Sequence, residues 1–244
     1  MRHSLLLSRR TAKEILRDPL TLLFGLGFPL VILGLLSAIQ ANVPVPLFAI
    51  EQLGPGVTVF GLSFMALFSA LLISKDRSSA LLLRLYTTPL RPVDYILGYL
   101  LPMLPIALAQ TAVCYVFSLI LGLAWTPRIL LCVALSAPAA MVFLSVGLLC
   151  GSLLNDKQVG GICGALLTNL SAWLSGAWFD PAMVGGAFEA AAKALPFLRA
   201  VLAGRAAMAG EPVFPHLAWV LAYAAVFLAL AVAVFYRRMR QGKI

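Results

Sequence analysis

RSSALLLRLYTTPLRPVDYILGYLLP, residues 77–102, joins two kinds of sequence in one stretch. Its first part mixes arginines and small polar residues with leucines, as a short amphipathic helix does. It then breaks at Pro89 and Pro92 and runs straight into an apolar segment that is long enough to enter a membrane. Because proline lacks an amide donor and disfavours helix at the residue before it, the amphipathic part should end there. The stretch predicts a short helix at a membrane surface, placed between two spans.

The composition of the whole chain indicates a membrane protein. Of its 244 residues, 62% are hydrophobic and only 11% are charged, whereas charged residues make up about 25% of a soluble domain. All nine acidic residues fall outside the long apolar runs, as expected where an unpaired charge costs several kcal/mol in hydrocarbon. The net charge of +9 therefore belongs to loops and tails. There it favours contact with anionic membrane lipids, and we expect no nucleic-acid partner.

Six apolar runs reach the roughly 20 residues that a helix needs to cross about 30 Å of hydrocarbon. The first run follows basic residues, as in a signal peptide, but it exceeds the about 7–15 apolar residues of such a peptide. We therefore interpret it as a retained span. The expected fold is an all-α integral membrane domain over residues 1–244 with spans at 20–39, 56–74, 95–121, 129–154, 158–178 and 214–236.

The distribution of Lys and Arg predicts the orientation of these spans. If the N-terminus is cytoplasmic, the segments on that side hold 14 of the 18 Lys and Arg residues, and those on the other side hold 4. Cytoplasmic loops carry an excess of Lys and Arg. We therefore expect a multi-pass protein of a bacterial-type cytoplasmic (inner) membrane, with both termini in the cytoplasm.

Residues 1–18 are predicted to form an amphipathic interfacial helix along the inner leaflet. On a helical wheel one side carries Leu5, Ser8, Ala12, Ile15 and Leu16. The opposite side carries Arg10, Lys13, Glu14 and Arg17. The helix should end at Asp18 and Pro19, where the chain turns into the membrane. A generic positively charged anchor on the cytoplasmic side is the alternative.

The loop at 75–94 is predicted to contain the second amphipathic helix, from Asp76 to Thr88. With only about 13 residues it is too short to span. Its polar face should be available to a soluble partner in the cytoplasm, and this face carries Asp76, Arg77, Ala80, Arg84, Thr87 and Thr88. The apolar face carries Leu81, Leu82, Leu85 and Tyr86.

Residues 179–210 do not resemble a simple loop. They contain the turn-prone FDP and GG elements and two short apolar stretches, around Phe188 and from Leu195 to Leu202. We expect a re-entrant or outer-interfacial pair of helices between the fifth and sixth spans. An ordinary extracellular loop is the alternative.

No catalytic, cofactor or metal site emerges from the sequence. Each of the four cysteines lies in an apolar span without a CxxC partner, which is typical of packing residues. The two histidines, His3 and His216, are far apart in the sequence. No phosphate loop of the GxxxxGK[ST] type is present, so we expect that this chain does not hydrolyse ATP.

The more polar residues within the spans are Gln110, Thr111, Asn169 and Ser171. We interpret them first as interhelical hydrogen-bonding groups, since such pairs are common in membrane bundles. A place in a substrate pathway remains the alternative. The spacings of Gly147 with Gly151, and of Gly160 with Gly164, would permit close helix packing.

The order of these features resembles the permease subunit of a type-2 ATP-binding-cassette (ABC) transporter. The resemblance covers nearly the whole chain and is most specific in TTPLRPVDYILGYLLP, where Tyr95 and Gly98 open the third span. A second similar region is residues 174–208, which resembles the family's short helices dipping into the outer leaflet, with Pro196 at the recurrent proline position.

This resemblance implies a half-transporter. Two such chains would pair, as a homodimer or with a related permease, and each would sit on an ABC nucleotide-binding ATPase subunit that binds ATP and Mg²⁺. The helix that couples ATP hydrolysis to the spans would include Asp76, Arg77, Arg84, Thr87, Thr88 and Pro89. The expected activity is export of an amphipathic or hydrophobic compound such as a drug or lipid. The alternatives are a secondary transporter or channel independent of ATP, and a membrane-embedded enzyme.

Overall fold

The computed structural model describes residues 2–46, 48–79 and 92–241. In this part of the chain every regular element is helical and no strand is present. The elements in chain order are α1 (Arg2–Leu16), α2 (Pro19–Leu22), η1 (Leu23–Gly27), α3 (Phe28–Gln40), α4 (Ile50–Ser78), α6 (Pro92–Ile120), α7 (Arg128–Leu153), α8 (Asp156–Val159), η2 (Gly160–Leu167), α9 (Thr168–Leu174), η3 (Pro181–Met183), α10 (Gly186–Ala194), α11 (Pro196–Ala209) and α12 (Phe214–Gln241). Elements η1 and η2 are π-helical, and η3 is a 3₁₀ turn.

The chain is a multi-pass membrane protein, since five helices in the described residues are long and apolar enough to cross a bilayer. They are Leu23–Ala41, Ile50–Ser78, Val93–Ile120, Arg128–Leu153 and Phe214–Arg238. They correspond to five of the six predicted spans.

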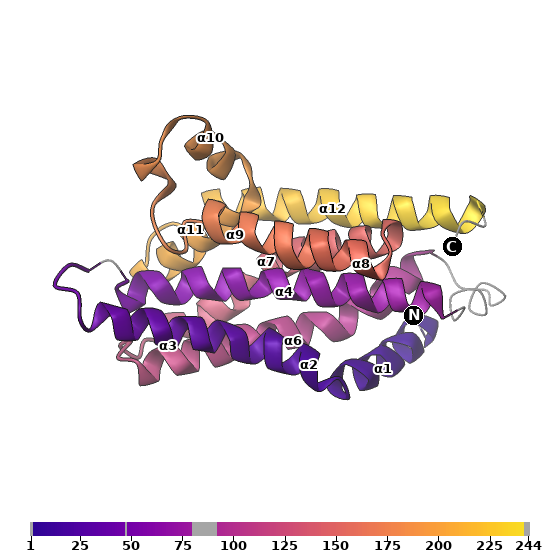
Figure 1. The fold of residues 1–244 in the computed structure, drawn as a ribbon, viewed down its shortest axis with the longest axis horizontal. Helices are drawn as coiled ribbons and strands as arrows, with labels where there is room; N and C mark the ends of the chain where they lie inside the picture. The colour runs from indigo at the N-terminus through magenta and orange to yellow at the C-terminus, as the bar shows by residue number, and fades with distance from the viewer. Residues whose placement is uncertain (1, 47, 80–91, 242–244) are drawn as a thin grey trace.

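The six-span prediction is not confirmed in full. The fifth predicted span, 158–178, is helical only from Asp156 to Leu174, through α8, η2 and α9, and it is not among the five. The helical stretch begins with the polar residues Asp156, Lys157 and Gln158 and also contains Asn169. These residues lower its mean hydropathy. Its position beside α4 and α7 is nevertheless that of a member of the bundle (Figure 1).

The long helices run side by side, and the ends of the chain lie at the same end of the bundle (Figure 1). We call this the termini end. The opposite end carries α10 and the turn between α3 and α4, and we call it the α10 end. An up-and-down path of this kind follows from short turns between long antiparallel helices.

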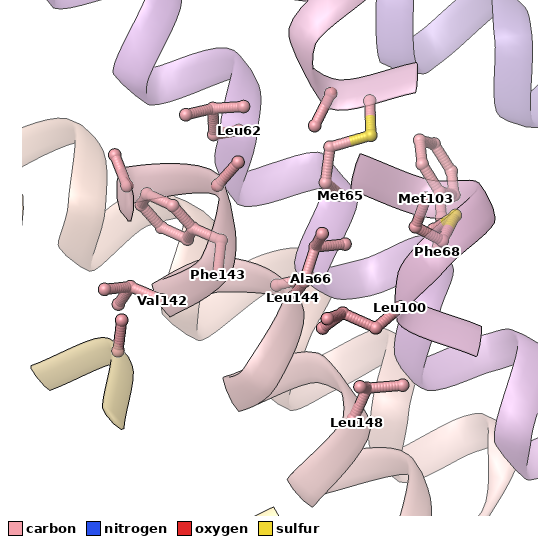
Figure 2. Close-up of a cluster of buried hydrophobic side chains, with 14 of the residues drawn as sticks. Leu62, Met65, Ala66, Phe68, Leu100, Met103, Val142, Phe143, Leu144 and Leu148 are labelled. Carbon is pink, nitrogen blue, oxygen red and sulfur yellow. The ribbon is translucent and has the colours of Figure 1, made fainter. Parts of the chain in front are cut away.

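Helix α4 lies at the centre of the bundle. It contacts α3, α6, α7, η2 and α11, and most of its side chains are buried. Figure 2 shows part of the resulting core, in which side chains of α4, α6 and α7 meet, including Leu62, Met65, Ala66, Phe68, Leu100, Met103, Phe143, Leu144 and Leu148.

Glycines set the distance between α4 and α7. A Cβ added at Gly147 would collide with the carbonyl oxygen of Ala66, and one at Gly151 would collide with that of Ala70. The predicted close packing at this pair of glycines is therefore confirmed. For the second pair, an added Cβ at Gly160 would meet no atom within 4 Å, and one at Gly164 would lie 3.4 Å from the side chain of Leu67.

The segment at 179–210 contains two helices, α10 and α11. Helix α11 packs against α4, α7 and α12, and Phe197 stacks on Phe143 of α7 at 5.4 Å between ring centroids. Phe188 of α10 is partly buried and stacks on Phe179. The segment is thus partly built into the bundle, while its re-entrant position in a bilayer stays a prediction.

Candidate functional site

The side chains that join α1, α4 and α6 form a charged cluster at the termini end. The guanidinium of Arg10 donates two hydrogen bonds to the carboxylate of Asp76, at 2.7 and 2.9 Å. The hydroxyl of Tyr99 donates a third at 2.7 Å. Oε2 of Glu14, one turn along α1, lies 3.0 Å from Nη2 of Arg10. We call Arg10, Glu14, Asp76 and Tyr99 the Asp76 cluster.

In the Asp76 cluster the negative charge of Asp76 is balanced by hydrogen bonds from Arg10 and Tyr99. Asp76 is only 2% exposed, and a buried carboxylate is tolerated where charged and neutral donors satisfy it. The hydrogen bond between Arg10 and Asp76, together with the negative charges of Asp76 and Glu14, raises the pKa of the Arg10 guanidinium above its usual value. The arrangement therefore holds one carboxylate rigidly between a cation and a phenol.

Close contact of the helix backbones brings Arg10 to Asp76. A Cβ added at Gly98 of α6 would lie 2.7 Å from Cγ of Leu7, so only a glycine lets α1 approach this closely. Leu7, Thr11 and Ile15 form the buried stripe of α1. Of the predicted apolar side of this helix, Ile15 is buried, while Leu5 and Leu16 are exposed.

Arg77 ties the same end of α4 to α7. Its guanidinium donates to the carbonyl oxygens of Gly151 at 2.7 Å and Leu154 at 3.2 Å. A cation on the last carbonyls of a helix is also favoured by the helix dipole. Nearby, the hydroxyl of Ser74 bonds to the carboxylate of Asp156. The end of α4 is therefore fastened to α1, α6, α7 and α8.

The predicted coupling helix needs a correction at its start. Asp76 and Arg77 do not begin a second helix but lie in the last turns of α4, which ends at Ser78. Their hydrogen bonds hold them against neighbouring helices and not on an open polar face. The other predicted coupling residues, Arg84, Thr87, Thr88 and Pro89, lie outside the described residues.

The polar residues within the spans do not form a common site. Gln110 and Thr111 are fully buried in α6 and bond to Cys114 and Ala107 of the same helix. Ser171 is also buried and bonds to Thr168 one turn earlier. In the described residues no hydrogen bond joins any of these residues to another of the four.

Asn169 differs from the other three because it is exposed. Its amide nitrogen donates to the carbonyl oxygen of Ala165 at 2.8 Å. The neighbouring side chains on this face, Leu166, Leu170 and Trp173, are exposed as well. An amide on an apolar outer face is costly against lipid. Among the described residues, Asn169 is thus a polar group on an otherwise apolar exposed face.

Sequence reasoning missed the partners of Asp76. The sequence puts Arg10 on the polar side of its helix without a partner, and it assigns no role to Tyr99. The one available signal was Gly98, whose lack of a side chain beside Tyr99 marks a close helix contact. Elsewhere, no group of three His, Cys, Asp or Glu side chains in the described part of the chain could hold a metal ion. The four cysteines are free thiols.

Comparison with protein-family models identifies the family of the chain. The family model for the ABC-2 type transporter matches residues 3–209, which run from α1 to the end of α11. This is the permease domain of type-2 ABC transporters. A search of curated protein sequences finds no match.

Proposed function

The chain belongs to the ABC-2 type transporter family, and we propose from this that it is the permease subunit of an ABC exporter. The membrane component of this family generally is not the ATPase and normally pairs with an ABC ATPase subunit. ATP and Mg²⁺ would bind to that separate subunit. This chain would supply the passage across the membrane and bind no cofactor.

The proposal uses the loop at 75–94 as the contact with the ATPase. The observation that supports this role is that the last turns of α4, the central helix, are hydrogen-bonded to neighbouring helices. There Asp76 bonds to α1 and α6, and Arg77 bonds to the end of α7. A displacement of the loop would be passed to four helices at once, since packed cores shift between discrete arrangements and do not deform continuously.

Asn169 supports the pairing of two permeases. An exposed amide among Leu166, Leu170 and Trp173 is satisfied if a second copy or a hydrated pathway covers it. We propose that α9 faces such a pathway, in a homodimer or a pair of related chains. Apolar surface with a few hydrogen-bonding groups suits an amphipathic or hydrophobic cargo such as a drug or lipid.

The proposed setting is a bacterial-type inner membrane with the termini end in the cytoplasm. The 14 Lys and Arg residues assigned to that side support this orientation. Export then moves cargo from the side of the ATPase to the α10 end.

Transport by the complex tests the proposal. Inside-out vesicles that contain the chain and its ATPase should take up a lipophilic dye with ATP and not with a non-hydrolysable analogue. Uptake that continues without nucleotide would favour the alternative, a secondary transporter or channel. In the purified complex, Arg84→Glu should reduce the amount transported per ATP hydrolysed while insertion into the membrane stays normal. An unaltered ratio would remove Arg84 from the coupling role.

A further inference from the structure

A cavity of about 360 Å³ lies at the bend between α1 and α2, beside α4 and α6. Its floor is apolar and is made by Ile15, Phe68, Leu72 and Met103, all of which are at least nine-tenths buried. Figure 2 shows Phe68 and Met103 next to each other at one edge of the core. Its rim is charged and carries Glu14, Arg17, Asp18 and Lys75. An apolar floor under a charged rim fits an amphiphile.

Both carboxylates of the rim, Glu14 and Asp18, already interact with other side chains of the chain. Glu14 pairs with Arg10. Asp18 accepts a hydrogen bond of 2.8 Å from the hydroxyl of Thr21, at the start of α2. Both negative charges thus have partners within the chain.

The two cations of the rim, Arg17 and Lys75, have no such partners among the described residues. Within the residues that the structure describes, neither Arg17 nor Lys75 has a side-chain hydrogen bond or ion pair, and both are exposed. A second hollow shares Glu14 and Arg17 with the cavity and adds the cations Arg9, Arg10 and Lys13 of α1. The surface around the cavity therefore offers cations without matching anions, which favours an anionic ligand.

The place of the cavity favours a ligand from the membrane over one from solution. Leu16 at the end of α1, and Leu23 and Phe24 at the start of the first span, are exposed apolar side chains close to the cavity in the chain. The mouth thus lies where apolar surface gives way to basic surface. Headgroups of anionic lipids bind in basic pockets between membrane helices.

We propose that this cavity binds the phosphate headgroup of an anionic membrane lipid. Arg17 and Lys75 hold the phosphate, and the beginning of an acyl chain lies on Phe68 and Leu72. The volume is at the lower end of the roughly 300–1,000 Å³ of small-molecule sites, so it admits a headgroup and not a whole lipid. The bound lipid joins the end of α1 to α4, next to the Asp76 cluster. This inference does not depend on the transport function.

The test titrates phosphatidylglycerol into the purified chain in neutral detergent and measures the fraction with bound lipid by native mass spectrometry. Lys75→Gln should weaken binding about tenfold, because a charge-assisted hydrogen bond is lost, and Lys75→Arg should retain it. The matched control is Lys157→Gln, an exposed lysine at the same end of the bundle but outside this cavity. It should weaken binding less than about twofold.

Each other outcome contradicts the proposal. Equal losses in Lys75→Gln and Lys157→Gln would mean a diffuse attraction of basic surface to lipid. No loss in Lys75→Gln or in Arg17→Gln would remove the cavity from lipid binding. Phosphatidylcholine that binds as tightly as phosphatidylglycerol would rule out selection for negative charge. Inorganic phosphate or glycerol phosphate that displaces the lipid at equal concentration would identify a site for a soluble phosphate.

Discussion

Arg10 and Asp76 are 66 residues apart in the chain and form a two-pronged ion pair with distances of 2.7 and 2.9 Å. The pair joins the first helix to the end of the central one. Arginine suits this place because its planar fork matches both oxygens of a carboxylate. The pair therefore fixes the angle of α1 as well as its distance from α4.

A double-mutant cycle should measure this pair. Arg10→Gln and Asp76→Asn should each lower stability, and the double variant should lose less than the sum. We expect a coupling free energy of about 1–2 kcal/mol. A fully buried pair would give more, but the side chain of Arg10 is 39% exposed. Unfolding in a mild detergent provides the measurement, and additive losses would show that the two side chains do not stabilise each other.

Gly98→Ala should displace α1. The new methyl group would overlap Leu7, and overpacking of this kind costs about 1–3 kcal/mol. Leu7→Ala in the same chain should restore part of the lost stability, because it empties the same space. Thermal unfolding of the three variants compares them. Absence of rescue would mean that Gly98 has another role.

Gly147→Ala should be more damaging than Gly160→Ala. The first adds a methyl group against the backbone of Ala66, which cannot move without shifting α4. The second adds one in open space and exchanges a glycine for a better helix former, a gain of up to about 1 kcal/mol. Folded yield and melting temperature of the isolated chain should separate the two, and similar values would contradict the close contact of α4 with α7.

Asn169→Leu should reduce ATP-driven transport and leave the stability of the single chain nearly unchanged. Its side chain is exposed and bonds only within its own helix among the described contacts. Gln110→Leu is the comparison, because Gln110 is fully buried beside Gly61, so its replacement should act on stability. If Asn169→Leu transports normally, this face does not line the pathway.

Cysteine labelling should place the two ends of the bundle on opposite sides of the membrane. In a cysteine-free background, Ser79→Cys at the termini end and Met183→Cys at the α10 end present exposed positions. A membrane-impermeant maleimide added to intact cells should label position 183 and not position 79. Labelling of position 79 in sealed cells would reverse the proposed orientation.

The helices were predictable from the sequence because about 20 apolar residues in a row have few alternatives to a span. The residues at which the helices end were not predictable in the same way. The charges at Lys75, Asp76 and Arg77 suggested that the second span stops at 74, yet α4 continues to Ser78. A helix can carry Asp76 inside because Arg10 and Tyr99 complete its hydrogen bonds, and partners so distant in the chain leave no local signal.

The same limit applies at α1, where the sequence does not show which side packs against the protein. A helical wheel ranks sides by hydrophobicity and puts Leu5 and Leu16 on the apolar side with Ile15. The structure buries Thr11 between Leu7 and Ile15 instead. The shape of α6 at Gly98 decides this choice. In a membrane, moreover, an outward leucine meets lipid and loses nothing, so hydrophobicity does not distinguish the inner face from the outer one.

The π-helical turns of η2 have a consequence for the rotational setting of the residues after them. Element η2 is π-helical from Gly160 to Leu167, so this stretch holds more residues per turn than an α-helix. Each residue of an α-helix turns by about 100°. Deleting Gly161, which meets no neighbouring atom, would let the stretch return to α-helical winding. The face with Asn169 and Trp173 would then be rotated relative to α8 by the difference between the two windings, so η2 sets the direction in which α9 points the amide of Asn169.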